Sequence, residues 1–444
     1  MVTRKLLTQD ANQRLRTGDL DGALRGLIAL VRSAPHDLDA RQRMGDALLA
    51  ANAIPQSVQC YAFVAREGTL SGHPLEAIVA LKVLTRIDPT VQGLLTPLAQ
   101  RYAAGSPSLG KSVRLAPADP ESEVPSAAFV PNELSAEQII ALAGQVGASR
   151  EGLPGYPALV APIPLLSELP ADAFERMLAT VELRRLAPGQ AILKEGDAGD
   201  AFFMLVRGTA SVSRRNLSTT EDLSSASEVV LATLSKGAII GEMALVSGAP
   251  RTATVAMVDD GDVLVFGRDA ITAVAREIDA VAQALGRFTR DRLLQNLLAT
   301  HPIFRPFDRT QRAQLAARFS AHDAPAESVI IREDSQGRGL FLLLTGQVDI
   351  TRRGASGPVV LATLGPGEVF GEISLLDQTP TTATVTTSRN STVLFLAREL
   401  FERLIAGVPE LRAYFEELAQ ERVMDTNLTM SAEPDPNETS TFLV

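Results

Sequence analysis

The stretch that decides the fold runs Gly241-Glu242-Met243-Ala244-Leu245-Val246-Ser247-Gly248-Ala249-Pro250-Arg251-Thr252-Ala253-Thr254-Val255. A glycine and a carboxylate open a short apolar turn, a loop of small residues follows, and Pro-Arg leads into a β-branched strand. The Glu242 carboxylate only accepts hydrogen bonds, which suits sugar hydroxyls. Backbone N–H groups of the turn that begins at Gly241 can face an anion, and Arg251 offers a planar fork for phosphate oxygens. These residues in this order predict a cradle for a small phosphorylated sugar.

The stretch resembles the phosphate-binding cassette of cyclic nucleotide-binding domains, whose pattern is Phe-Gly-Glu-Leu-Ala-Leu, a short gap and then Pro-Arg-Ala-Ala. The match has no gaps, and Ile240 replaces the opening phenylalanine. By this resemblance, Glu242 binds the ribose 2′-hydroxyl and Arg251 binds the cyclic phosphate, together with the backbone N–H groups of Ala244 and Thr252. The resemblance therefore implies a ligand site formed by Gly241, Glu242, Met243, Ala244, Pro250, Arg251, Thr252 and Ala253.

The resemblance leaves the base open between cAMP and cGMP. In the resembled family, alanine after the arginine is typical of cAMP-selective members, whereas threonine, here Thr252, often allows cGMP through its hydroxyl. Threonine also occurs in members that respond to cAMP. We therefore expect cAMP as the ligand, with cGMP as the alternative, and no further cofactor.

The cassette occurs a second time. Residues 359–364 repeat residues 229–234 letter for letter, and a second Gly-Glu pair follows at Gly371 and Glu372. The offset between the two cassettes is constant, because Gly241 corresponds to Gly371 and Pro250 corresponds to Pro380. A repeat at this spacing indicates two copies of one domain-sized module.

The second copy differs from the first at one decisive position, because Thr381 stands where the first has Arg251. A cyclic phosphate would lose its only side-chain cation in the cassette, at a cost of about 1.5–3 kcal/mol, or tenfold to over a hundredfold in affinity. The second module is therefore expected to be structural, to bind weakly, or to bind another ligand. Its weakened or lost site comprises Gly371, Glu372, Ser374, Thr381 and Thr382.

Composition limits the classes of function. The chain of 444 residues has a net charge of −10, which argues against direct binding to nucleic acid or to an anionic membrane. The sequence contains no apolar run of membrane-spanning length and no signal peptide, so we expect a cytoplasmic protein. Its single cysteine and four histidines lack metal-ligand spacing, and no catalytic motif is present. We therefore expect neither an enzyme nor a metal site. The excess of arginine over lysine suggests a bacterial source.

Residues 1–105 are expected to form helices, because apolar residues recur at helical spacing from Leu20 to Val31. The segment resembles tetratricopeptide repeats, whose period is about 34 residues. Ala23 precedes Pro35 by twelve residues, as Ala77 precedes Pro89. A plain helical bundle is the alternative. Repeat hairpins present concave surfaces, so we expect a protein partner to bind these helices.

The rest of the chain divides by composition. Residues 106–164 are rich in Pro, Ala and Gly and form a linker with one short helix, which a capping box at Ser135 and Gln138 begins. Residues 165–300 and 301–423 are the two modules, and the polar residues 424–444 are expected to be a disordered tail. The expected fold is multidomain α+β. It consists of an α-helical repeat-like domain followed by two β jelly rolls with flanking helices.

These features predict a cyclic nucleotide receptor that couples ligand binding in the first module to a protein partner. The layout is similar to that of protein kinase A regulatory subunits, although the linker lacks an Arg-Arg-x-Ser-like inhibitor sequence. One alternative is a scaffold whose modules have lost their ligand. Another is a transcription regulator that acts through a partner, since no basic recognition helix follows either module. The sequence is compatible with a homo-oligomer.

Overall fold

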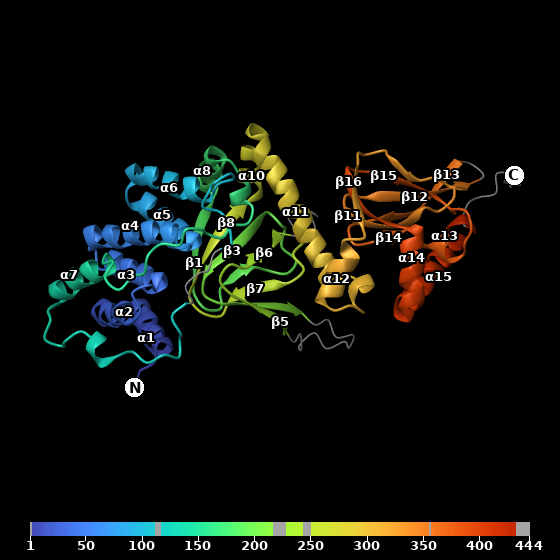
Figure 1. The fold of residues 1–444 in the computed structure, drawn as a ribbon. Helices are drawn as coiled ribbons and strands as arrows, with labels where there is room; N and C mark the ends of the chain where they lie inside the picture. The colour runs from blue at the N-terminus through green and yellow to red at the C-terminus, as the bar shows by residue number, and fades with distance from the viewer. Residues whose placement is uncertain (1, 112–116, 216–227, 243–249, 355–356, 432–444) are drawn as a thin grey trace, which may run out of the picture. The chain divides into compact units, whose positions relative to one another are not determined.

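The structure is a computed structural model that describes residues 2–111, 117–215, 228–242, 250–354 and 357–431. The chain forms two compact units, residues 1–286 and residues 287–444 (Figure 1). The first unit contains the N-terminal helices and the first module, and the second contains the second module. The predicted α+β architecture, with helices followed by two antiparallel β modules, is confirmed.

Five helices of the N-terminal part pack as successive hairpins. The step from the start of α1 to that of α3 equals the step from α2 to α4, and both match the period of about 34 residues read from the sequence. Side chains of Thr3, Asp19 and Asp37 cap the first three of these helices. The helices are α1 (Arg4–Thr17), α2 (Leu20–Ser33), α3 (Leu38–Ala50), α4 (Ile54–Ser71) and α5 (Pro74–Ile87), with η1 (Pro89–Leu94) and α6 (Leu95–Tyr102) after them.

The Pro-rich segment after α6 is packed against the helices over much of its described length. It contains η2 (Ser126–Ala128) and α7 (Ala136–Gly147), and the predicted capping box of Ser135 and Gln138 is present. Helix α7 packs on α2, α3 and α4 (Figure 1). Its Ile139 and Ala143 are fully buried in the same core as Leu27 of α2. The segment therefore adds to the hydrophobic core of the first unit.

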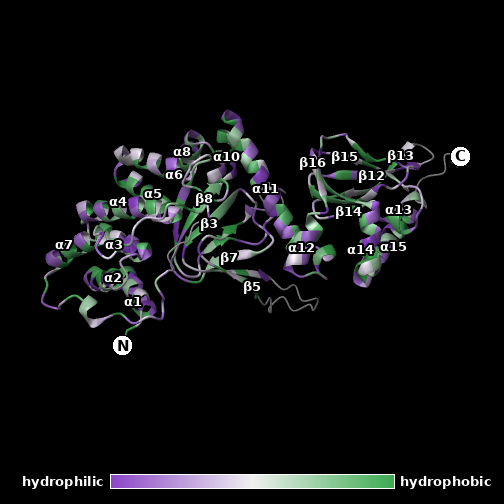
Figure 2. Ribbon diagram, viewed as in Figure 1, coloured by the Kyte–Doolittle hydropathy of each residue, from purple (hydrophilic) through white to green (hydrophobic). Residues whose placement is uncertain are grey.

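The first module is built from two four-stranded antiparallel sheets, with strand orders β1-β8-β3-β6 and β2-β7-β4-β5. Hydrophobic residues gather along its inner strands (Figure 2), and β3 is buried over its whole length. The strands are β1 (Glu182–Leu186), β2 (Ala191–Leu193), β3 (Ala201–Arg207), β4 (Ala210–Arg215), β5 (Glu228–Leu234), β6 (Ile239–Ile240), β7 (Thr254–Met257) and β8 (Gly261–Gly267).

The second module repeats this plan with the sheets β14-β11-β16-β9 and β10-β15-β12-β13. The offset between corresponding strands is constant up to β4 and β12, and it is shorter from β6 and β14 onward, so the extra residues of module one lie between β4 and β6. The strands are β9 (Ser320–Ala324), β10 (Val329–Ile331), β11 (Gly339–Thr345), β12 (Val348–Gly354), β13 (Gly357–Leu364), β14 (Val369–Phe370), β15 (Thr384–Thr387) and β16 (Ser391–Ala397).

Helices flank both modules, and the last one extends beyond the sequence-based expectation. The apolar residues from Ile271 to Phe288 lie on two helices, because the backbone at Ile278 leaves the helical region with φ −132°. Residues 424–431, expected in the disordered tail, form the end of α15, and residues 432–444 lie outside the described residues. The flanking helices are η3 (Leu166–Glu168), α8 (Ala171–Thr180), α10 (Arg268–Glu277), α11 (Asp279–Thr300), η4 (Pro302–Phe304), α12 (Arg309–Ala316), α13 (Glu372–Leu376), α14 (Arg398–Gly407) and α15 (Pro409–Ser431).

A buried polar network joins the N-terminal helices to the first module. The carboxylate of Asp262 in β8 is fully buried and accepts hydrogen bonds from the Gln42 amide of α3 and, at 3.0 Å, from the Arg207 guanidinium of β3. Asp46 of α3 pairs with Arg185 of β1 at 2.6 Å. Burial lowers the pKa of Arg207, but Asp262 and Asp46 outweigh it, so the pKa is raised above its ordinary value.

A second contact of this kind involves the turn before β6. Lys236 pairs with the buried carboxylate of Glu76 in α5 and lies 3.7 Å from Asp39 of α3. Burial opposes the charge of Lys236, yet the two carboxylates raise its pKa above the ordinary value. The helices and the first module therefore share one interior. None of the described helices is both long and apolar enough to span a bilayer.

Candidate functional site

The first cassette is organised around the backbone of Gly241 and the side chain of Arg251. Gly241 follows β6 and has φ 79°, a conformation that favours glycine. Arg251 is 5% exposed, and its guanidinium donates hydrogen bonds of 2.6 Å to the carbonyl oxygens of Gly241 and Ala201. The structure thus brings together the glycine and the arginine that the sequence singled out.

Several charged side chains act on Arg251. Burial lowers the pKa of its guanidinium, and Asp200, whose Oδ1 is 3.7 Å away, opposes that shift. The guanidinium also lies 5.8 Å from the ring centroid of Phe203 in β3. The Asp200 side chain is 86% exposed, so water screens this pair. Arg251 is therefore a buried cation whose guanidinium donates its two hydrogen bonds of 2.6 Å to uncharged carbonyl groups.

The other predicted residues of the first site are placed only in part. Glu242 is half-buried at the start of the turn, Pro250 and Thr252 are exposed, and Ala253 is half-buried. Met243 and Ala244 lie outside the described residues. The assignment of these eight residues to a ligand site remains a prediction.

Replacing Gly241 with alanine should disturb the first cassette. A Cβ at this position would lie 2.6 Å from a guanidinium nitrogen of Arg251 and 2.9 Å from Leu193, in a backbone conformation that side chains rarely adopt. We expect the variant to weaken cyclic nucleotide binding at least tenfold in calorimetry. The matched control is Gly237→Ala, which has φ 88° but no atom within 4 Å of the added Cβ. Equal affinities of the two variants would contradict the role of Gly241.

The second cassette holds its carboxylate in a different way. Glu372 begins α13 and is 1% exposed. Its Oε1 accepts a hydrogen bond of 2.8 Å from Arg422 of α15, and the same guanidinium nitrogen donates to the carbonyl oxygen of Val369 at 2.6 Å. The second module therefore uses an arginine from its last helix to neutralise the cassette carboxylate.

The main chain at Thr381 matches that at Arg251. The N–H of Arg251 donates to the Asp197 carbonyl and its carbonyl accepts from Gly196, and Thr381 makes the same two bonds to Ser335 and Asp334. The side chains differ, because the buried Thr381 hydroxyl donates to the Arg332 carbonyl and accepts from the Ser335 N–H at 3.0 Å. The Thr381 hydroxyl is therefore already bonded to the turn at residues 332–335.

Arg422 is the site residue that sequence reasoning missed. Because a disordered tail was expected from residue 424 onward, Arg422 was expected at the very end of the last helix, whereas α15 continues to Ser431. The internal repeat holds the missing signal, because Arg292 of α11 precedes Arg422 by the same interval that separates Gly241 from Gly371. A long helix after each module, with an arginine at the same position, could have been read from the sequence.

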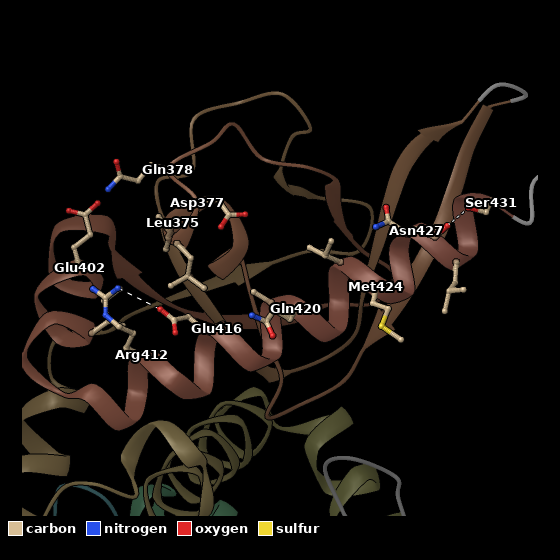
Figure 3. Close-up of a pocket in the computed structure, with 15 residues that line it drawn as sticks. Leu375, Asp377, Gln378, Glu402, Arg412, Glu416, Gln420, Met424, Asn427 and Ser431 are labelled. Atoms are coloured by element: carbon tan, nitrogen blue, oxygen red, sulfur yellow. Dashed lines mark hydrogen bonds and ion pairs between the residues drawn. The ribbon is translucent and has the colours of Figure 1, made fainter.

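Several cavities lie on the second module. One, of about 130 Å³, contains the cassette residues Glu372, Ser374 and Thr382 together with Arg422. A larger groove of about 850 Å³ lies among α13, α14 and α15, and Figure 3 shows its lining side chains with the Arg412–Glu416 ion pair. That groove contains neither the cassette carboxylate nor a cassette threonine. A third cavity, of about 240 Å³, reaches Gly371, Ser374 and Thr381 but not Glu372, so the cavity of about 130 Å³ is the candidate site. No cluster of metal-binding side chains occurs within the described ranges.

The comparison with protein families decides the nature of these modules. The model of the cyclic nucleotide-binding domain matches residues 183–277 and 322–407. The chain carries two tandem cyclic nucleotide-binding domains. Each match begins in the first strand region of a jelly roll and ends in the helix after its last strand, so both cyclic nucleotide-binding domains include a cassette.

The chain is also similar to named regulatory proteins. It is 31% identical over 255 residues to a cAMP-dependent protein kinase regulatory subunit of Aspergillus niger, covering 57% of this chain and 60% of the relative. A subunit of the same name from Schizosaccharomyces pombe is 27% identical, with coverages of 56% and 58%. The chain thus spans 58–60% of the length of these relatives. Their fungal origin contradicts the bacterial source suggested by composition, because an arginine excess does not identify a lineage.

Solved structures give matches over the same region. The regulatory domain of Toxoplasma gondii PKA with cAMP is 23% identical, covers 57% of this chain and 92% of its own, and has a TM-score of 0.26. The Thermus thermophilus catabolite activator protein is 28% identical, with coverages of 29% and 62% and a TM-score of 0.27. The identification therefore rests on the family match and on the cassettes.

Proposed function

We propose that the protein is a cyclic nucleotide receptor whose tight site is the first cassette, with cAMP as its ligand and cGMP as the alternative. The observation that carries this proposal is the buried guanidinium of Arg251, which is hydrogen-bonded to the carbonyl of the cassette glycine Gly241. A phosphate that enters there can replace two neutral carbonyl acceptors by charged oxygens, and charge-assisted hydrogen bonds are about twice as strong as neutral ones. Glu242 supplies the acceptor for the ribose hydroxyl.

Isothermal titration calorimetry of the full chain tests the proposal. We expect one tight site per protomer for cAMP or cGMP, because the second cassette lacks the phosphate cation. Thermal-shift measurement with both nucleotides separates this receptor from a scaffold that has lost its ligand, which should show no shift. Absence of binding and of any shift would contradict the proposal.

Introducing the missing cation should create a second site for cyclic nucleotide. The backbone at Thr381 is held as it is at Arg251, so Thr381→Arg is expected to direct a guanidinium toward the cassette glycine Gly371. Calorimetry should then give two sites per protomer, the new one weaker than the first. The matched control is Thr379→Arg, which adds the same charge at an exposed position outside the cavity that contains Glu372. Two equally tight sites in the wild-type chain would contradict this assignment.

We further propose that the receptor has a regulatory output and acts on a protein partner without catalysis of its own. The N-terminal helices are the proposed partner site, at a groove of about 420 Å³ beside α1 and α3. Module one forms one side of this groove through Lys236 and Asp259, and α7 occupies another part of these helices. A photocrosslinker at the exposed Gln9, which lines the groove, should reach the partner. This placement would be contradicted if a crosslinker at Gln9 captured no partner and only crosslinkers placed in module two did.

A further inference from the structure

The turn that leads into β6 is held from two sides. Lys236 in this turn pairs with the carboxylate of Glu76 in α5, which is 2% exposed, and lies 3.7 Å from the carboxylate of Asp39 in α3. From within the module, the N–H of Gly237 donates to the carbonyl oxygen of Leu205 in β3 at 2.7 Å. Because a buried carboxylate without its cation is costly, Glu76 keeps Lys236 in this place.

Strand β6 connects this turn to the first cassette. It pairs with β3 through Ile239 and Ile240, and Gly241 follows it directly. Gly241 lies five positions after Lys236. Its carbonyl oxygen accepts a hydrogen bond of 2.6 Å from Arg251. One short strand therefore links a contact with the N-terminal helices to the cassette glycine.

The second acceptor of Arg251 lies on a strand that the helices also hold. The guanidinium donates to the carbonyl oxygen of Ala201 at the start of β3, again at 2.6 Å. At the other end of β3, Arg207 donates to the buried Asp262 at 3.0 Å, and Asp262 accepts a hydrogen bond from Gln42 of α3. Both carbonyl groups that hold Arg251 are therefore carried by strands whose far ends are tied to the N-terminal helices.

We propose that Lys236 is a positioning residue, through which the N-terminal helices hold Gly241 against Arg251 and thereby weaken cyclic nucleotide binding. This inference rests on the proposed function, in which phosphate oxygens replace the two carbonyl groups as acceptors of Arg251. The Gly241 carbonyl must then give up its hydrogen bond, and a strand anchored at its other end resists the movement. Lys236, Glu76 and Asp39 also line the groove proposed for the partner, so the restraint lies between the two proposed sites.

Calorimetry of the full-length Lys236→Met variant with cAMP and with cGMP tests this proposal. The substitution keeps an unbranched apolar side chain and removes the charge, which releases the turn from Glu76. We expect cyclic nucleotide binding to become tighter by about threefold or more. Lys236→Arg keeps the charge and should restore the wild-type affinity. Glu76→Gln weakens the same pair from the opposite side, so the double variant should bind no tighter than either single variant.

The matched control is Lys82→Met. Lys82 is a lysine of α5 that also reaches the first module, but its ammonium group donates to the carbonyl oxygens of Leu178 and Ala179 in α8. Helix α8 carries neither acceptor of Arg251. We therefore expect Lys82→Met to lose stability in urea denaturation without a change in cyclic nucleotide affinity.

Two results would overturn the proposal. Unchanged affinity in folded Lys236→Met and Glu76→Gln variants would mean that the contact only stabilises the fold. Weaker binding by both variants would mean that the helices preorganise the cassette for its ligand. If Lys236→Met does not fold, Lys236→Gln takes its place. A wild-type chain that binds no cyclic nucleotide would overturn the proposed function and this inference with it, whereas the two results above would overturn this inference alone.

Discussion

Replacing Arg251 with alanine is expected to weaken cyclic nucleotide binding by tenfold to more than a hundredfold. The guanidinium is the buried side-chain cation of the first cassette, and the loss of a charged hydrogen-bond partner costs about 1.5–3 kcal/mol or more. Calorimetry of the full chain with cAMP and with cGMP measures the change. Arg251→Lys should lie between the wild type and Arg251→Ala, because it keeps the charge but loses the planar fork.

The matched control is Arg176→Ala. Arg176 is an exposed arginine of α8 that pairs with the exposed Glu277, so its removal should leave affinity unchanged. Melting temperatures are needed for Arg251→Ala, because Arg251 also holds the carbonyl groups of Gly241 and Ala201. Unchanged affinity in a folded Arg251→Ala variant would reject the first cassette as the tight site.

Replacing Asp262 with alanine is expected to lower the free energy of unfolding of the first unit by about 3–5 kcal/mol. Asp262 is fully buried, and its removal leaves the buried Arg207 without its nearest carboxylate and Gln42 without its acceptor. Breaking a buried ion pair by removing one partner has a cost of this size, because the remaining charge loses its nearest compensation; the other carboxylate near Arg207, that of Asp46, lies 3.9 Å away. Urea denaturation followed by circular dichroism measures the loss.

The control for this prediction is Asp10→Ala. Asp10 pairs with Arg14 four residues later on the exposed face of α1, and such pairs contribute about 0.3–0.5 kcal/mol. A similar small loss for Asp262→Ala would mean that water or a rearranged helix compensates Arg207. Deleting residues 1–105 would remove Gln42 and Asp46 but keep the Asp262–Arg207 pair, because both of those residues belong to the module.

The cassettes and the repeat could be recognised from the sequence because each depends on local order. A glycine that needs φ 79° at position 241, a carboxylate beside it and an arginine ten residues later form a pattern within one turn and one loop. Hydrophobic periodicity and caps likewise predicted the helices, including α7 with its Ser135 and Gln138 box. The replacement of Arg251 by Thr381 was visible for the same reason.

The sequence by itself determined the two modules, the helical N-terminal part and the difference between the two cassettes. Tertiary structure alone decided that Arg422 neutralises Glu372, that the Thr381 hydroxyl is bonded to the distant turn at residues 332–335, and that Asp262 joins the module to the helices. The physical reason is that these partners lie far apart along the chain and leave no local spacing to read. Whether a carboxylate is free, paired or half paired depends on which distant donor the fold brings to it.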